Sequence, residues 1–133
     1  MDLLKQFGTS KELEVNGVIF KLDDTTSFTL ARASSLNTKY QTTLTNLMKP
    51  YKRQMQMGTL QDEIARDLLV RAFVKGCLLD WKGVCFGGKK LSFSEENALT
   101  LLKDLPDLFD ILNEESQRME NFRQEEVEDS VKK

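Results

Sequence analysis

The stretch from Leu78 to Leu112 reads LLDWKGVCFGGKKLSFSEENALTLLKDLPDLFDIL and carries the signals for one hairpin and two helices. It contains the only tryptophan of the chain, Trp81, and the pair Gly87-Gly88 lies between short apolar runs. Adjacent glycines readily adopt the positive φ angles of a tight two-residue turn. We therefore expect a short β-hairpin near residues 84–93.

Two helices are predicted after this hairpin. Ser94 precedes two glutamates, and a serine N-cap followed by carboxylates in the first turn is typical of a helix start. Pro106 occupies a position that is favoured at the beginning of a further helix. The apolar positions of these helices are Ala98, Leu101, Leu102, Leu108, Phe109, Ile111 and Leu112, and more thinly Met119 and Phe122.

Upstream of this stretch, the apolar pattern predicts a central helix over about residues 60–80. Its two adjacent apolar rows are Ile64, Leu68 and Ala72, and Leu69, Phe73 and Cys77. Because so broad an apolar face is typical of a buried helix, we place it in the core. Trp81-Lys82-Gly83 is expected to end the helix, and Trp81 is interpreted as a core plug rather than as a ligand platform.

Another helix is predicted to begin near Leu36. Its apolar stripe has a helical period and consists of Leu36, Tyr40, Leu44, Leu47, Met48, Tyr51 and Met55. Pro50 lies within the stripe and lacks the N–H that the helix requires, so we expect a kink or a break near Lys49. Gly58 is expected to stop the helix, and Thr59 with Asp62 resembles the N-cap of the next one.

The N-terminal part is predicted to be a small sheet. Asn16-Gly17 between apolar runs indicates a type I′ turn, Asp23 to Thr26 indicates a second turn, and residues 27–32 alternate as a strand. We therefore predict an α+β fold, mainly a helical bundle, with an N-terminal antiparallel β-meander and the hairpin near 84–93. Residues 1–12 are expected to be a flexible N-terminus, residues 13–122 a single domain, and residues 123–133 a disordered charged tail.

The composition indicates a soluble globular protein. Of the 133 residues, 40% are apolar and 30% are charged, and no apolar run approaches the ~20 residues needed to cross a bilayer. The N-terminus also lacks the apolar core of a secretion signal, so we expect a cytoplasmic protein. The net charge is −2. Nucleic-acid binding is not expected. The alternative left open is that a small basic face around Lys49, Lys52 and Arg53 binds nucleic acid.

The residues do not suggest a catalytic or metal site. The chain has no histidine, which removes Ser–His and Cys–His systems and most zinc sites. Cys77 and Cys85 are interpreted as buried small apolar residues rather than as a disulfide bridge. Gly87-Gly88-Lys89-Lys90 lacks the spacing of a phosphate loop. The paired acids are interpreted as cap and surface residues; they are Asp23-Asp24, Glu95-Glu96 and Glu114-Glu115. We expect no enzyme activity and no cofactor.

The methionines are candidates for contacts with a partner. Methionine is adaptable and recurs where proteins bind amphipathic helices. A core position is favoured for Met48 and Met55, whereas Met57 and Met119 lie near helix ends and are the better candidates for an interface. The predicted partner-binding set, on exposed apolar positions of the last helix and of helix ends, is Met57, Phe109, Met119 and Phe122.

Several short motifs follow one another along the chain. They are Ala31-Arg32, Lys39-Tyr40, Lys49-Pro50-Tyr51, Trp81-Lys82-Gly83-Val84, Ser94-Glu95-Glu96-Asn97-Ala98 and the Leu-Pro-Asp-Leu-Phe run of residues 105–109. In this order they resemble the tail assembly chaperones of tailed bacteriophages, over about residues 13–122. The motifs are structural rather than catalytic. Ser34-Ser35 is a departure, because members of that family often have Gly-Asn after the Ala-Arg pair.

The resemblance implies a protein that binds the long helical tape measure protein, keeps it soluble and promotes assembly of the tail tube. Contacts with the tail tube protein and weak self-association are further implied possibilities, without nucleic-acid or membrane partners. Such a protein acts in the host cell cytoplasm and is absent from the mature virion.

In many such phages, ribosomal frameshifting near the end of the gene gives a longer form. Val131-Lys132-Lys133 is compatible with an adenine-rich slippery sequence. The alternative function, from another class, is a structural virion component such as a tail-tube or head–tail completion protein.

Overall fold

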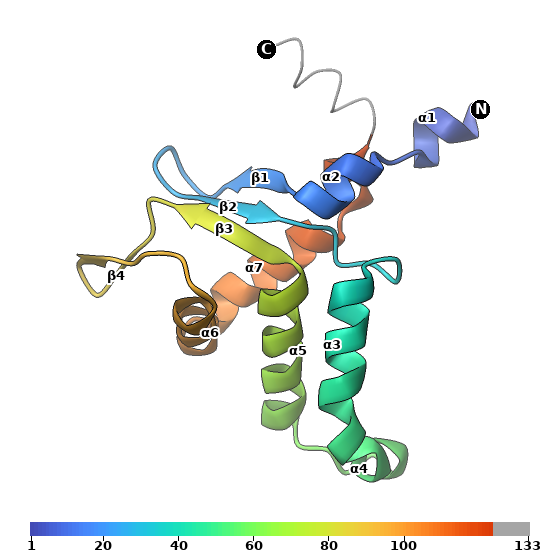
Figure 1. Cartoon of the computed structure of the whole chain (residues 1–133), viewed down its shortest axis with the longest axis vertical. Coiled ribbons are helices and arrows are strands. Elements are labelled where there is room, and N and C mark those ends of the chain that lie inside the picture. Colours follow the sequence, from blue (N-terminus) through green and yellow to red (C-terminus); the bar gives the residue numbers. More distant parts are fainter. Residues whose placement is uncertain (124–133) are drawn as a thin grey trace.

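A computed structural model describes residues 1–123 of the chain, except for the side chain of Met119. The fold is α+β and mainly helical, as predicted. Figure 1 shows a small sheet at one end of the molecule and two long helices, α3 (Thr38–Met48) and α5 (Asp62–Gly76), which run away from it side by side. The short helix α4 (Lys52–Met57) lies at the far end of this pair.

The remaining elements complete the fold. The other helices are α1 (Leu3–Phe7), α2 (Lys11–Asn16), α6 (Glu95–Asp104) and α7 (Pro106–Gln117), with the 3-10 turns η1 (Lys49–Tyr51) and η2 (Met119–Phe122). The strands are β1 (Val18–Lys21), β2 (Ser27–Leu30), β3 (Leu78–Lys82), β4 (Cys85–Phe86) and β5 (Lys89–Lys90). The first three strands form an antiparallel sheet in the order β1-β2-β3, and β4 pairs with β5.

The first predicted strand is wrong, because residues 11–16 form helix α2. Ser10 caps this helix, and its Oγ accepts a hydrogen bond of 3.2 Å from the N–H of Leu13. Gly17 has φ +90° and ends the helix, whereas a type I′ turn also needs positive φ at Asn16, which is helical. The serine cap and the two glutamates in the first turn therefore outweigh the Asn-Gly signal.

The third strand of the sheet is also not the predicted one. It is β3, from a segment that the apolar pattern assigned to the end of the central helix. β2 is thereby paired on both sides, with Phe28 opposite Trp81, and its backbone groups find partners in two neighbours. The helix α5 ends at Gly76, where an added methyl group would lie 2.6 Å from Cα of Tyr40. The N-terminal meander is therefore replaced by a sheet of two local strands and one distant strand.

Several predicted helix boundaries are confirmed. α3 ends at Met48, and Pro50 lies in the 3-10 turn η1 that separates α3 from α4. Gly58 ends α4 in the left-handed conformation, with φ +68°. Ser94 caps α6, with its Oγ 3.0 Å from the N–H of Asn97, and Pro106 lies at the start of α7. These boundaries depend on local backbone requirements.

Two boundaries differ from the prediction. The N-cap of α5 is Gln61 rather than Thr59. The last helix ends at Gln117, because Arg118 has an extended backbone, and Met119–Phe122 is a separate 3-10 turn. The side-chain amide of Asn121 donates a hydrogen bond of 2.7 Å to the carbonyl of Glu115, which satisfies one of the carbonyls left open by this end.

The core lies where the sheet meets α5, α6 and α7. Trp81 is 6% exposed, so its prediction as a core plug is confirmed. Its Nε1 donates a hydrogen bond of 2.8 Å to the carbonyl of Leu91, and its ring meets Phe28 and Phe93 edge-on. The predicted hairpin is confirmed as β4–β5, with Gly87 and Gly88 at φ +62° and +80°.

The predicted division of the chain into residues 1–12, 13–122 and 123–133 stays a prediction. Of the predicted tail, Arg123 forms an isolated antiparallel bridge with Thr9, and residues 124–133 lie outside the described residues. Within residues 1–123, no helix combines the length and the apolar character that a membrane crossing requires.

Candidate interaction surface

The helices α3 and α4 with the turn η1 form an arm, which we define as residues 38–57, and the arm carries a shallow groove. Met48 and Met55 contribute apolar side chains to it, and Lys49 and Lys52 lie beside them. The groove has a volume of about 480 Å³, and its remaining lining residues are Thr45 and Gln56. Pro50 lies in η1 between the two methionines, so residues from both sides of the break in the helix line the groove.

Apolar side chains on the arm are exposed to solvent. Met55 is 39% exposed, although the sequence analysis favours a core position for it, and Met48 is half-buried. Met57 is 65% exposed at the end of α4, as expected for a residue of an interaction surface. Exposed methionines can adapt to different partner side chains.

The arm carries cations and no carboxylate. The sequence has no carboxylate between Asp24 and Asp62. The cations of the arm are Lys39, Lys49, Lys52 and Arg53, whereas Arg32, in the same interval, is paired with Glu14. Elsewhere in the fold, exposed cations are often paired, as in the bonds of 2.7 Å between Arg66 and Asp110 and of 2.9 Å between Lys103 and Asp67.

A second group of exposed apolar side chains lies on α1. Leu3, Leu4 and Phe7 are 64%, 65% and 62% exposed. Asp2 caps this helix, with its Oδ1 accepting a hydrogen bond of 3.0 Å from the N–H of Leu4. In Figure 1, α1 extends from the body of the molecule on the side of the sheet, away from α4. The two exposed apolar regions therefore lie at different places on the fold.

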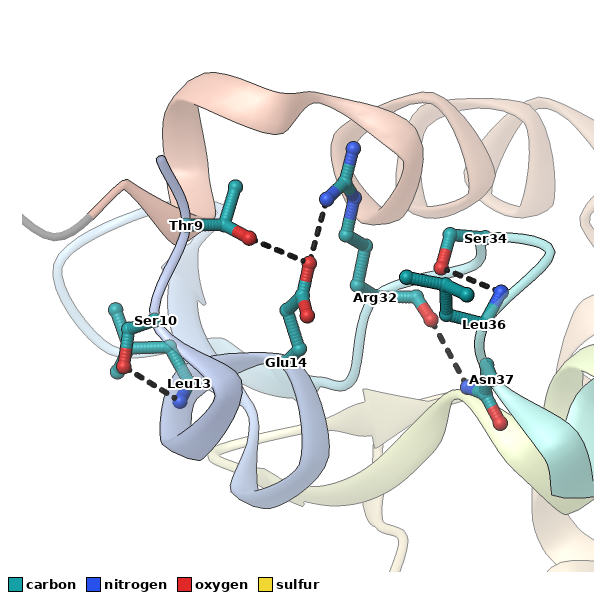
Figure 2. A network of polar contacts seen from close by, with 8 residues as sticks. All are labelled: Thr9, Ser10, Leu13, Glu14, Arg32, Ser34, Leu36 and Asn37. Atoms are coloured by element: carbon teal, nitrogen blue, oxygen red, sulfur yellow. Dashed lines mark hydrogen bonds and ion pairs between the residues drawn. The ribbon is translucent and has the colours of Figure 1, made fainter. Parts of the chain in front are cut away.

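The corner between α2, β2 and α3 is a polar network with a structural role. Figure 2 shows Glu14 reaching from α2 to the guanidinium of Arg32, at 2.5 Å, while Thr9 donates a hydrogen bond of 2.9 Å to the same carboxylate oxygen. The N–H of Arg32 also donates to the carbonyl of Glu14, at 3.0 Å. These contacts explain why an Ala-Arg pair suits the end of this strand. The turn with Ser34 follows, and its Oγ accepts a hydrogen bond from Leu36 N–H.

Asn37 connects this corner to α3 and α5. Its Oδ1 accepts a hydrogen bond of 3.0 Å from the N–H of Tyr40 and so caps α3. Its Nδ2 lies 2.9 Å from the carbonyl of Arg32 and 3.0 Å from that of Gly76. A hollow of about 410 Å³ beside this residue is lined in part by the exposed side chains of Val15 and Leu36.

The two cysteines differ in environment. Burial raises the pKa of the Cys77 thiol to about 12, although a hydrogen bond with Ser116 acts in the opposite direction. Burial of Tyr40 likewise raises the pKa of its hydroxyl, and the nearby Cys77 adds to that shift. Cys85 lies exposed on β4. Cys77 is therefore a buried apolar residue, as predicted, whereas the prediction for Cys85 as a buried residue is wrong.

The four predicted partner-binding residues do not lie together on one surface. Phe109 and Phe122 are 3% and 0% exposed, so the expectation that they are accessible is wrong. Phe109 meets Phe73 of α5 edge-on at 5.5 Å between ring centroids, which places it in the core. Met57 is exposed on the arm, and the side chain of Met119 lies outside the described part of the molecule.

Met48 and Met55 are the surface residues that sequence reasoning assigned to the core. Their helical spacing predicts one apolar stripe along the helix, but only tertiary contacts decide how far the stripe is covered. The stripe is buried at Tyr40, near the sheet, and becomes accessible toward α4. The signal that could have found this surface is the absence of carboxylates between Asp24 and Asp62.

Comparison with protein families identifies a match over most of the chain. Residues 35–133 match a protein family described as YdaY prophage protein. No curated protein and no solved structure matches the chain. The matched range contains the arm, α5, the hairpin and the last two helices. Within the residues that the structure describes, no group of three or more Cys, Asp or Glu side chains is placed to hold a metal ion.

Proposed function

Because the chain belongs to the family of YdaY prophage proteins and is of phage origin, we propose that it is a tail assembly chaperone of a tailed phage. In this role it binds the tape measure protein in the host cytoplasm, keeps it soluble and promotes assembly of the tail tube around it. The protein then leaves before the virion is complete. The proposed role is one of binding rather than of catalysis.

The observation that carries this proposal is the exposed apolar surface of the arm and of α1. Met55, Met57 and Phe7 remain accessible although the fold has a well-formed core elsewhere. Removing apolar surface from water contributes roughly 25 cal/mol per Å² before the entropy lost on association is subtracted. A long helical protein that has not yet been covered by its tube would offer apolar stripes to such residues.

The roles of the resemblance motifs support the same proposal. Trp81 donates its indole N–H to the backbone of the hairpin, and Gly83 lies so close to the carbonyl of Thr25 that a side chain would overlap it. Ser94 caps α6, and Pro106 starts α7. These three motifs therefore occupy positions that need their residue types, which is what a shared fold requires.

Co-expression tests the proposal directly. The chain is produced together with the tape measure protein of its own phage, and the soluble fraction of that partner is measured after centrifugation. We expect a several-fold increase over expression of the tape measure protein alone. A matched control is the chain with Met55→Glu and Met57→Glu, which places charges on the exposed surface and leaves the core unchanged. Equal solubility with and without the chain would overturn the proposal.

Mass spectrometry of purified virions distinguishes the proposed function from a structural virion component. A chaperone is absent from the finished particle, whereas a tail-tube or completion protein is present in a fixed ratio to the other tail proteins. A stoichiometric amount of the chain in virions would therefore overturn the chaperone role. The same samples also report whether a longer, frameshifted form exists.

A further inference from the structure

We propose that the groove on the arm binds an amphipathic helix whose apolar stripe is flanked by aspartate or glutamate side chains. The inference rests on the proposed function only for the choice of a helical partner. The chemistry of the partner is inferred from the groove itself, which is open and is lined by apolar side chains (Met48 and Met55, the floor) and by cations (Lys49 and Lys52, the rim). It assigns the arm, rather than the last helix, as the docking surface for the partner.

The floor of the groove suits apolar side chains of a helix. Met48 and Met55 are seven residues apart in sequence, one on each side of the break at Pro50. A volume of about 480 Å³ is within the range of sites that take ligand groups of several atoms. Unbranched, polarizable methionine side chains adjust to different apolar partners, which a chaperone surface requires.

The rim of the groove suits carboxylates. Lys49 and Lys52 line it, and Arg53 follows on the same short helix. The nearest carboxylates in the sequence are at the start of α5, where Glu63 lines a different hollow together with Arg66 and Lys103 of α6. Unlike charges 4 Å apart attract by roughly 1 kcal/mol in water and more where water is displaced. The charge on the rim therefore favours an acidic partner over a neutral or basic one.

A nucleic acid is the less favoured acidic partner. Phosphate backbones are bound by dense arrays of Lys and Arg, and unstacked bases by exposed aromatic rings. Here Met48 and Met55 line the groove beside the cations, Tyr40 on the arm is buried, and the half-buried Tyr51 does not line the groove. Phosphates would neutralise the lysines and leave the apolar floor in contact with water, whereas an acidic amphipathic helix covers both.

The test uses labelled synthetic peptides and the full chain. One probe is a helical peptide with leucine at every third or fourth position and glutamate at the flanking positions, and the matched probe has lysine in place of every glutamate. Fluorescence anisotropy measures binding at low and at physiological salt. We expect the glutamate peptide to bind at least about tenfold more tightly than the lysine peptide, with a difference that shrinks as salt rises.

Charge reversal assigns the binding to the groove. Lys49→Glu with Lys52→Glu should weaken binding of the glutamate peptide by about tenfold or more and strengthen binding of the lysine peptide. The matched control is Lys89→Glu with Lys90→Glu on the exposed strand β5, which makes the same change in net charge outside the groove. The exchange of preference in one variant also shows that the reversed protein is folded.

Three results would overturn the inference: equal binding of the two peptides, equal effects of the two double variants, or tighter binding of a single-stranded oligonucleotide than of the glutamate peptide at physiological salt. Co-expression distinguishes a failure of this inference from a failure of the proposed function. If the groove is wrong and the chaperone role is right, co-expression still increases the solubility of the tape measure protein and the Lys49→Glu, Lys52→Glu variant does so equally well.

Discussion

The hydroxyl of Ser116 donates a hydrogen bond of 2.6 Å to the carbonyl oxygen of Ala31, which links the last helix to the end of the central strand. The N–H of Ala33 in turn donates to the carbonyl of Ser116, at 2.9 Å, and the N–H of Ala31 to that of Cys77, at 2.8 Å. Ala31 and Ala33 precede the range that matches the prophage family. The early strands are therefore integrated into the fold of the matched region rather than appended to it.

Replacing Ser116 with alanine should destabilise the protein by about 1–2 kcal/mol, because it removes a buried hydrogen bond and leaves a carbonyl without this donor. Urea unfolding measures the change. Ser35→Ala, at an exposed serine in the turn before α3, is the control and should change stability by less than about 0.5 kcal/mol. Equal stabilities of the two variants would contradict the role of this bond.

Replacing Gly83 with alanine should cost more than replacing Gly88 with alanine. Both glycines have positive φ, +72° and +80°, so both changes incur backbone strain of about 1–2 kcal/mol. At Gly83 the new methyl group would also overlap the carbonyl oxygen of Thr25, whereas at Gly88 it meets open space among the described residues. We expect a total loss of at least about 3 kcal/mol for Gly83→Ala by urea unfolding. Similar losses for both variants would be the contrary outcome.

The two thiols should react at very different rates in the native protein. At pH 8, a thiol-specific reagent should modify the exposed Cys85 quickly and the buried Cys77 only after unfolding, because the pKa of Cys77 is raised to about 12. Cys85→Ser should therefore abolish the fast phase, and Cys77→Ser should leave it unchanged. Two thiols that react equally fast without denaturant would show that Cys77 is accessible.

The side chain of Asp67 should make stability depend on acid pH. Burial alone would raise its pKa, but hydrogen bonds from Arg71 and Lys103 outweigh burial and hold the pKa below the usual value of 3.8. The folded state therefore binds this proton less readily than the unfolded state. The resulting stabilisation is present above about pH 4 and is lost as the pH falls through the lowered pKa.

Comparison of the wild type with Asp67→Asn measures this effect. Since the ion pairs are partly exposed, the difference should be only about 0.5–1 kcal/mol at pH 7, and smaller in 1 M salt. It should decrease steadily below pH 4. A difference that stayed constant down to pH 2 would show that the charge of Asp67 is not its source.

Local signals predicted the boundaries that depend on a few neighbouring residues. The pair Gly87-Gly88 forms the hairpin turn, Ser94 caps a helix and Pro50 separates two helices, because each satisfies a requirement of the backbone at its own position. The pair Asn16-Gly17 shows the limit of such signals. Gly17 adopts positive φ as expected, but it ends a helix instead of forming a hairpin.

Apolar periodicity predicted which residues share one face of a helix, but it did not predict which elements cover that face. Phe109 packs against Phe73 of α5, and Phe122, whose carbonyl accepts a hydrogen bond from the N–H of Ser10, is fully buried, so both are core residues rather than docking residues. Met55 belongs to the same stripe as Tyr40, yet only Tyr40 is buried by neighbouring elements. The interaction surface on the arm could therefore not be located without the tertiary contacts.

The sequence by itself determined the α+β class, the hairpin of the 78–112 stretch, the caps and breaks of its helices and the place of Trp81 in the core. These features follow from backbone sterics and hydrogen bonding within a few residues, and from the burial of the largest apolar side chain. Only the tertiary structure decided that residues 78–82 pair with β2 as a strand and that the methionines of the arm stay exposed. Both outcomes depend on contacts between segments far apart in the chain, where local preferences of about 1 kcal/mol are overridden by pairing and packing.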